Sequence, residues 1–98
     1  MGLLSRKSET KASREIEIVN QKGLHARPCS KIVKLAGSFR SEVWVTKDSD
    51  TVNGKSIMGL MMLAAGFGSR LTISCEGADS EEALAALEKL ILSKFDEN

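Results

Sequence analysis

Hydrophobic and polar residues alternate in four short stretches of the chain. Alternation with a period of two residues is typical of strands that bury one face, so each stretch is predicted to form a strand. In the first strand Ile16 and Ile18 would point inward, and the turn residues between the second and third strands predict a hairpin. The predicted strands are residues 15–19, 43–45, 51–53 and 70–76.

Apolar residues recur at helical spacing in three other stretches, which we predict to be helices. The first covers about residues 26–37, and the second covers residues 56–65, where Gly66 ends it. The third starts at Asp79 with capping-box spacing and acidic residues that suit a helix N-terminus, and it ends near Lys94. The resulting order, βαββαβα, predicts an α+β fold: an open-faced β-sandwich in which three helices cover one face of a four-stranded, mostly antiparallel sheet.

The chain has room for one compact domain, because 98 residues are too few for two separate cores. The first 14 residues contain four basic residues, one acidic residue and little to bury. We therefore predict a flexible N-terminal tail at residues 1–14 and a folded domain at residues 15–98. No stretch reaches the roughly 18 apolar residues of a membrane span, and the N-terminus lacks the apolar core of a secretory signal, so we expect a cytoplasmic protein.

Charge and cysteine content argue against several classes of function. The formal net charge is +1, and the predicted domain alone carries ten basic and twelve acidic residues, whereas nucleic-acid-binding domains usually have a clear basic excess. Cys29, Cys75 and the single histidine, His25, lack the spacing of a metal site, so no metal and no cofactor is expected.

The segment Gly-Leu-His-Ala-Arg-Pro at residues 23–28 is the most informative part of the sequence, because it places the only histidine where a loop becomes a helix. The free N–H groups and the positive dipole end of a helix disfavour imidazolium, keep the ring of His25 nucleophilic and attract an anion. Arg27 offers a planar guanidinium that fits phosphate oxygens, so the pair suits acceptance and transfer of a phosphoryl group. The spacing alone also fits a helix-cap histidine beside an ordinary surface arginine.

Three segments together resemble the family of the histidine-containing phosphocarrier protein, HPr, of the bacterial phosphotransferase system. They are Gly-Leu-His-Ala-Arg-Pro at 23–28, Asn-Gly-Lys-Ser-Ile-Met-Gly-Leu at 53–60, and Leu-Thr-Ile-Ser at 71–74 with an acidic helix start after it. The two longer segments are separately specific and occur in the family's order and separation. The resemblance extends over about residues 15–91.

The resemblance implies a relay in which enzyme I, itself phosphorylated from phosphoenolpyruvate, transfers its phosphoryl group to Nδ1 of His25, and an enzyme IIA domain receives the group next. Arg27 and the first N–H groups of the helix would hold the phosphoryl oxygens. Such a carrier acts as a cosubstrate of phosphotransferase enzymes, so whether it counts as an enzyme stays open. We expect it to need no cofactor and to be a monomer.

Ser56 stands at the start of the second predicted helix, where its hydroxyl would accept a backbone N–H as an N-cap. In many members of the HPr family the serine at this position is also phosphorylated by an ATP-dependent HPr kinase/phosphorylase, and the neighbouring residues here match that type. The resemblance therefore implies regulatory phosphorylation of Ser56.

The second predicted helix is apolar nearly all round, although a domain of this size cannot enclose a whole helix. Leu60 and Leu63, together with Ile57 or Met62, would fill the core, and the remaining side chains would form a surface for partner docking. The alternative is that all the methionines fill the core. The docking residues that the resemblance implies are Leu24, Ile57, Met58 and Met61.

Two questions of function stay open at this point. Residues 84–87 and the last five residues are similar to nitrogen-related carriers, whereas residues 55–59 are similar to the serine-regulated carbon type. We favour a regulatory role over sugar transport, with regulatory proteins among the partners. The rival function is a non-catalytic regulatory interaction module that binds partner proteins through the surface of the second helix, but the presence of His25 and Arg27 argues against it.

Overall fold

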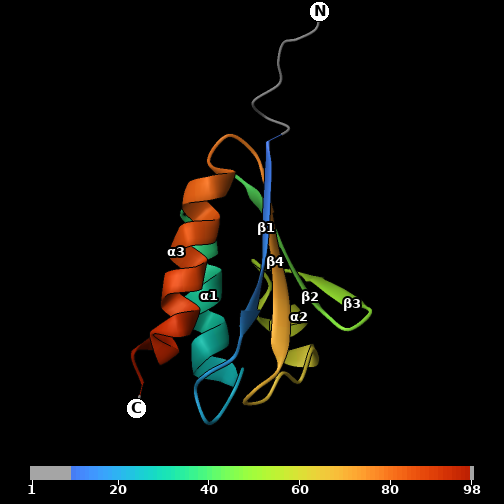
Figure 1. The fold of residues 1–98 in the computed structure, drawn as a ribbon, viewed down its shortest axis with the longest axis vertical. Helices are drawn as coiled ribbons and strands as arrows, with labels where there is room; N and C mark the ends of the chain where they lie inside the picture. The colour runs from blue at the N-terminus through green and yellow to red at the C-terminus, as the bar shows by residue number, and fades with distance from the viewer. Residues whose placement is uncertain (1–9, 98) are drawn as a thin grey trace, which may run out of the picture.

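Helices and strands follow one another in the predicted order βαββαβα within residues 10–97, the residues that this computed structural model describes (Figure 1). The strands are β1 (Lys11–Glu17), β2 (Glu42–Lys47), β3 (Asp50–Asn53) and β4 (Arg70–Glu76). The helices are α1 (Ala26–Gly37), α2 (Ile57–Met62) and α3 (Ser80–Leu92), and a short turn, η3 (Lys94–Asp96), follows α3.

The four strands form one antiparallel sheet in the order β1-β4-β2-β3. β1 and β3 are therefore its two edges, and β2 and β3 form the predicted hairpin. Figure 1 shows α1 and α3 side by side along one face of the sheet, and α2 contacts both α1 and β3. The predicted α+β architecture, an open sheet with three helices on one face, is confirmed.

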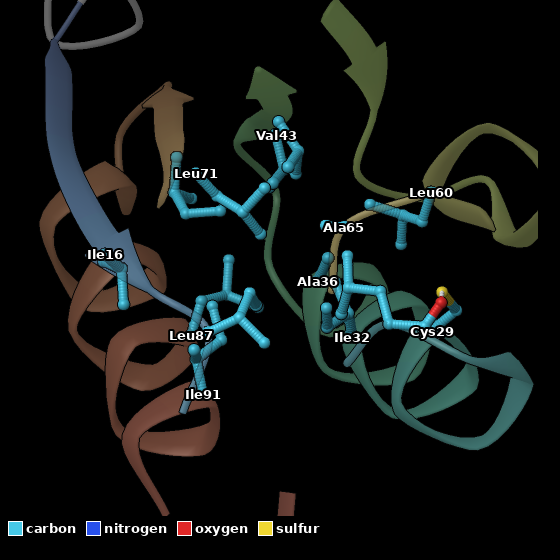
Figure 2. Close-up of a cluster of buried hydrophobic side chains, with 14 of the residues drawn as sticks. Ile16, Cys29, Ile32, Ala36, Val43, Leu60, Ala65, Leu71, Leu87 and Ile91 are labelled. Atoms are coloured by element: carbon cyan, nitrogen blue, oxygen red, sulfur yellow. Dashed lines mark hydrogen bonds between the residues drawn. The ribbon is translucent and has the colours of Figure 1, made fainter. Parts of the chain in front are cut away.

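The core lies between the sheet and the helices, where Figure 2 shows side chains such as Val43 and Leu71 meeting Ile32 of α1 and Leu87 of α3. Each of these four side chains is at most 1% exposed. Alternate strand residues and helix residues three or four apart point to one side of their element, so the two periodicities in the sequence bring their apolar residues into one interior. Burial of each such side chain contributes about 1.5–3 kcal/mol relative to exposure.

β1 begins four residues earlier than predicted, so the boundary drawn between residues 14 and 15 is wrong. Residues 11–14 pair with residues 73–76 of β4 in the same antiparallel register as the rest of the strand. The Oγ atoms of Ser13 and Ser74 lie 3.2 Å apart, and Arg14 forms an ion pair with Glu88 of α3. An edge strand is held by its backbone ladder and cross-strand side chains, so a polar sequence does not exclude it. Residues 1–9 of the predicted tail lie outside the described residues.

Two of the three helices end earlier than predicted. α2 stops at Met62 instead of residue 65, because Ala64 has a left-handed backbone with φ of 51°. α3 stops at Leu92, and the residues of η3 also have positive φ. Within residues 10–97 no helix combines the length and the apolar character needed to cross a membrane.

The carboxylate of Asp79 does not cap α3, contrary to the predicted capping box. Asp79 occupies the N-cap position without a capping hydrogen bond from its side chain. Its carboxylate instead accepts hydrogen bonds from the backbone N–H groups of Arg40 and Ser41, each at 2.9 Å, and from the Ser41 hydroxyl at 2.5 Å. The side chain therefore ties the start of α3 to the segment that enters β2, a long-range contact that local spacing does not reveal.

Candidate functional site around His25

The loop before α1 holds His25 in place through backbone contacts with a distant segment. The N–H of Leu24 donates to the carbonyl of Ala65 at 2.8 Å, and the side-chain amide of Asn20 donates to the carbonyl of Gly23 at 2.9 Å. Gly23 has φ of 67°, and a Cβ there would lie 2.5 Å from the Ala65 carbonyl oxygen. Only glycine satisfies both the left-handed backbone and the close approach.

His25 is the N-cap residue of α1, as predicted. Its backbone is extended, with φ of −85° and ψ of −171°, and its carbonyl accepts the hydrogen bond from the Cys29 N–H. The imidazole makes no capping hydrogen bond and is 38% exposed, so the ring is open to a partner. Ala26 and Arg27 occupy the first turn, where a helix offers their N–H groups no carbonyl, and Pro28 has no N–H to satisfy. The site therefore combines an accessible ring with free backbone donors.

Glu97 contacts the ring of His25, a contact that the sequence did not predict. Oε1 of Glu97 lies 3.3 Å from Nε2 of His25 and also accepts a hydrogen bond from the side-chain amide of Asn20 at 2.9 Å. Burial alone would raise the pKa of Glu97, but the hydrogen bonds from Asn20 and His25, with the charges of His25 and Arg27, lower it overall. Glu97 is therefore held as a carboxylate beside the histidine.

Arg27 lies on the exposed side of the first turn of α1 and forms no ion pair among residues 10–97. Its positive charge contributes to lowering the pKa of Glu97, as the charge of His25 does, so the guanidinium and the ring influence the same carboxylate. A planar guanidinium without a carboxylate partner is available for an anion that reaches the ring. The structure thus brings together the two residues that sequence spacing paired.

Ser56 is the N-cap residue of α2, as its position in the sequence indicated. Its Oγ accepts a hydrogen bond from the Gly59 N–H at 3.0 Å, and the side chain is half-buried. The next residue, Ile57, begins the exposed face of the helix. A change of charge at Ser56 would therefore act on both the helix start and the neighbouring surface.

The exposed face of α2 consists of four apolar side chains, which we call the α2 surface: Ile57, Met58, Met61 and Met62, exposed by 42%, 74%, 44% and 80%. Leu60 and Leu63 fill the core as predicted, but neither Ile57 nor Met62 joins them. The alternative in which all the methionines fill the core is therefore wrong for Met58, Met61 and Met62.

Leu24 was expected on the docking surface, but its side chain is 6% exposed and packs in the core, because its backbone is bound to Ala65. Phe67, 65% exposed between two glycines, was missed.

Neither cysteine has the surroundings of a reactive thiol. Cys29 is fully buried, and burial raises its pKa to about 11. Its Sγ atom lies 3.6 Å from the carbonyl oxygen of Leu24, so it packs beneath the loop that carries His25. Burial also raises the pKa of Cys75. Among residues 10–97 no group of histidine, cysteine and acidic side chains is placed to bind a metal ion.

Comparison with known proteins identifies relatives over most of the chain. The family model described as "PTS HPr component phosphorylation site" matches residues 12–93. The phosphocarrier protein HPr of Neisseria meningitidis serogroup A is 55% identical over 82 residues, which are 84% of this chain and 92% of that protein. The phosphocarrier protein HPr of Cupriavidus necator is 48% identical over 84 residues, 86% of this chain and 94% of that protein.

The solved structures give the same result for the fold. A crystal structure of HPr from Thermoanaerobacter tengcongensis superimposes with a TM-score of 0.86 at 49% sequence identity. The match covers 89% of this chain and 98% of that one. The range matched by the family model, residues 12–93, includes the loop and helix that carry His25 as well as α2.

Proposed function

The chain belongs to the HPr family of phosphocarrier proteins of the phosphotransferase system, and from this premise we propose that His25 accepts a phosphoryl group from enzyme I and passes it to an enzyme IIA domain. The observation that carries the proposal is the imidazole at the N-cap of α1, accessible and not engaged in capping the helix. In this role the protein is a cosubstrate of two phosphotransferases, and the proposal includes a cytoplasmic location.

The proposed chemical step is a transfer between nucleophiles. The lone pair of Nδ1 of His25 attacks phosphorus, a P–N bond forms, and the bond from phosphorus to the donor breaks with its electron pair remaining on the donor. A nucleophile of the IIA domain then attacks phosphorus, its bond to phosphorus forms, and the P–N bond breaks with its electron pair returning to Nδ1 of His25. Arg27 and the N–H groups of the first turn of α1 support the step, because they present positive charge and donors to the phosphoryl oxygens.

Docking is proposed to use the α2 surface. Four apolar side chains on one face of a short helix form an exposed hydrophobic surface, and contact with a partner would remove it from water. α2 packs on α1, the helix that carries His25. Methionine side chains are flexible and adapt to different partners, which suits a carrier that must bind both a donor and an acceptor. Phe67, in the segment that binds the His25 loop, extends the set of exposed apolar side chains.

Ser56 is proposed to be a regulatory site for an HPr kinase/phosphorylase. Its hydroxyl is within a half-buried N-cap and precedes Ile57 of the α2 surface. A phosphate there would add about −1.5 to −2 charges next to apolar docking residues, so it would oppose any complex that buries them. The hydroxyl oxygen accepts one hydrogen bond, from the Gly59 N–H, so its second lone pair stays free to attack a phosphoryl donor.

The test is incubation with enzyme I and labelled phosphoenolpyruvate, followed by acid and base treatment of the product. We expect label that is lost in acid and kept in base, as a phosphohistidine requires, and none in His25→Ala. The α2 surface alone would also suit a non-catalytic interaction module. An unlabelled wild-type protein that still binds enzyme I would favour that module over the carrier.

A further inference from the structure

Glu97 follows His25 by 72 residues and bonds the ring nitrogen that the proposed transfer does not use. The distance from Oε1 of Glu97 to Nε2 of His25 is 3.3 Å. We propose that Glu97 is a positioning residue, which keeps the proton of the neutral ring on Nε2 and thereby leaves the lone pair of Nδ1 free to attack phosphorus. This inference rests on the proposed function, because it assumes that His25 is the phosphoryl acceptor.

The direction of the hydrogen bond determines the tautomer. An ionised carboxylate has no proton to donate, so its bond with a neutral imidazole requires the hydrogen on Nε2. Hydrogen bonds from Asn20 and His25 outweigh the effect of burial and lower the pKa of Glu97, so the side chain is ionised at neutral pH. The other ring nitrogen then carries no proton, which is the state that a nucleophile needs.

Asn20 links the carboxylate to the loop that carries the histidine. Its side chain is 1% exposed, and its amide nitrogen donates to the Gly23 carbonyl and to Oε1 of Glu97, both at 2.9 Å. One amide therefore donates both to the carboxylate beside the ring and to the loop before it. The Gly23 carbonyl also accepts the His25 N–H at 3.0 Å, so Asn20 couples the position of the carboxylate to the backbone of His25.

The turn η3 brings Glu97 to the site. Phe95 is fully buried in the core, and Nζ of Lys31 on α1 donates to its carbonyl oxygen at 2.5 Å. Lys94, Phe95 and Asp96 have φ of 61°, 56° and 60°, a left-handed backbone that is costly for three consecutive residues other than glycine. A costly conformation persists only where its surroundings fix it, and here the core and α1 fix it beside His25.

The contact is compatible with each stage of the transfer. When Nδ1 forms its bond to phosphorus, the proton on Nε2 stays in place and the ring gains positive charge. The carboxylate of Glu97 faces that charge from the side opposite to the phosphoryl group, so the hydrogen bond strengthens as the charge develops. No proton has to leave the ring, and Glu97 does not occupy the position of the incoming group.

The first test reads the tautomer directly. Protein with 15N-labelled histidine is studied by two-bond proton–nitrogen NMR, at a pH where the ring is neutral, for wild type, Glu97→Ala and Asp96→Asn. Asp96 is exposed and adjacent, and asparagine tolerates its left-handed backbone, so Asp96→Asn removes one charge and keeps both the turn and the contact to the ring. We expect one tautomer with the proton on Nε2 in wild type and Asp96→Asn, and exchange between both tautomers in Glu97→Ala. Superimposable spectra of wild type and Glu97→Ala overturn the inference.

The second test measures phosphoryl transfer from enzyme I. The rate at saturating carrier should fall by roughly threefold to tenfold in Glu97→Ala, because one hydrogen bond to a charged group is lost. It should stay unchanged in Asp96→Asn, which keeps the turn and the contact between Glu97 and His25. An equal rate with a changed tautomer also overturns the proposal. The two proposals fail on different results. If wild type is not phosphorylated, the carrier function is wrong, whatever the tautomer measurement gives. If wild type is phosphorylated but Glu97→Ala has the same tautomer as wild type, only the role of Glu97 is wrong.

Discussion

The N–H of Leu24 donates a 2.8 Å hydrogen bond to the carbonyl of Ala65, and this contact joins the loop that carries His25 to the segment after α2. The donor belongs to the proposed chemical site, and the acceptor follows the helix that provides the α2 surface. The loop of His25 and the segment that follows the α2 surface are therefore joined directly through the backbone. The approach is so close that only a residue without a side chain fits at position 23.

Gly23→Ala should lower the free energy of unfolding by about 2–4 kcal/mol. The left-handed backbone costs about 1–2 kcal/mol for alanine, and the Cβ would lie 2.5 Å from the Ala65 carbonyl oxygen, so the backbone must also shift. Denaturant unfolding of both proteins measures the loss. Gly37→Ala is the matched control, because nothing lies within 4 Å of its Cβ, and it should unfold like wild type or slightly later. Equal losses at the two positions would contradict this account.

Arg27→Ala should reduce the rate of phosphoryl acceptance from enzyme I by at least about tenfold at saturating carrier, because the lost guanidinium acts on the transferring group. Stability should hardly change, since Arg27 is exposed and makes no ion pair within residues 10–97. Initial rates across a range of carrier concentrations separate the maximal rate from KM. Arg40→Ala, which removes the same charge beyond the other end of α1, should match wild type. If both variants slow transfer to the same extent, the loss of net charge explains the lower rate, and the guanidinium of Arg27 has no specific role.

Removal of residues 11–14 should cost about 1–3 kcal/mol of stability, measured as the difference between proteins that start at residue 11 and at residue 15. Four cross-strand pairs with β4 are lost, each worth about 0.2–1 kcal/mol. The ion pair between Arg14 and Glu88 is lost with them. Equal melting temperatures for the two truncated proteins would restore the sequence-based boundary at residue 15.

Asp79→Asn should reveal a stability difference that depends on pH. The hydrogen bond from the Ser41 hydroxyl is the largest influence on the pKa of Asp79, followed by that from the Arg40 N–H, and together they lower it. In the unfolded chain the carboxyl titrates near its ordinary value of about 3.9, so the unfolded state binds the proton first as pH falls. The stability of wild type relative to Asp79→Asn should therefore be complete above about pH 5 and vanish as the pH drops through the lower folded value. A difference in melting temperature that stays constant from pH 7 to pH 3 would exclude this linkage.

Most of the fold was predictable because its core follows local periodicity. Residues of β4 such as Leu71 and Ile73 alternate with polar neighbours, and the bounds of β4 and α1 match the predicted ranges. The N-terminal half of β1 was missed for the opposite reason. Of residues 11–14 only Ala12 is partly buried against the core, and all four pair with a strand more than 50 residues away, which a window of local sequence does not contain.

The candidate site was predictable only where its residues are neighbours in the chain. His25 and Arg27 share one turn, and Ser56 caps a helix, so spacing located all three. Glu97 reaches His25 through a left-handed turn that contains no glycine, so the sequence gives no sign of the turn. The Asp79 carboxylate accepts a hydrogen bond from Ser41 instead of capping its own helix. The burial of Leu24 likewise depends on its bond to Ala65. Each of these features is a tertiary contact that overrides the local preference.

Ser56→Asp should leave folding nearly unchanged but weaken docking to enzyme I. Aspartate serves as an N-cap as well as serine does, so its carboxylate would accept the hydrogen bond of the Gly59 N–H. The same charge would stand beside Ile57 of the α2 surface, and burying it against apolar residues of a partner costs free energy. We expect the apparent KM for the carrier to rise at least roughly tenfold, with most of the maximal rate recovered at high concentration.

Ser56→Ala separates the two roles of this position. It should lower stability by about 1 kcal/mol through loss of the cap, yet leave KM close to that of wild type, because it adds no charge beside the α2 surface. Thermal unfolding and initial rates against carrier concentration, measured on the same three proteins, give both quantities. Ser56→Ala should thus change stability but not KM, and Ser56→Asp should change KM but not stability. Superimposable rate curves for Ser56→Asp and wild type would remove the proposed switch, and a lower maximal rate at constant KM would place Ser56 in the transfer step instead of in docking.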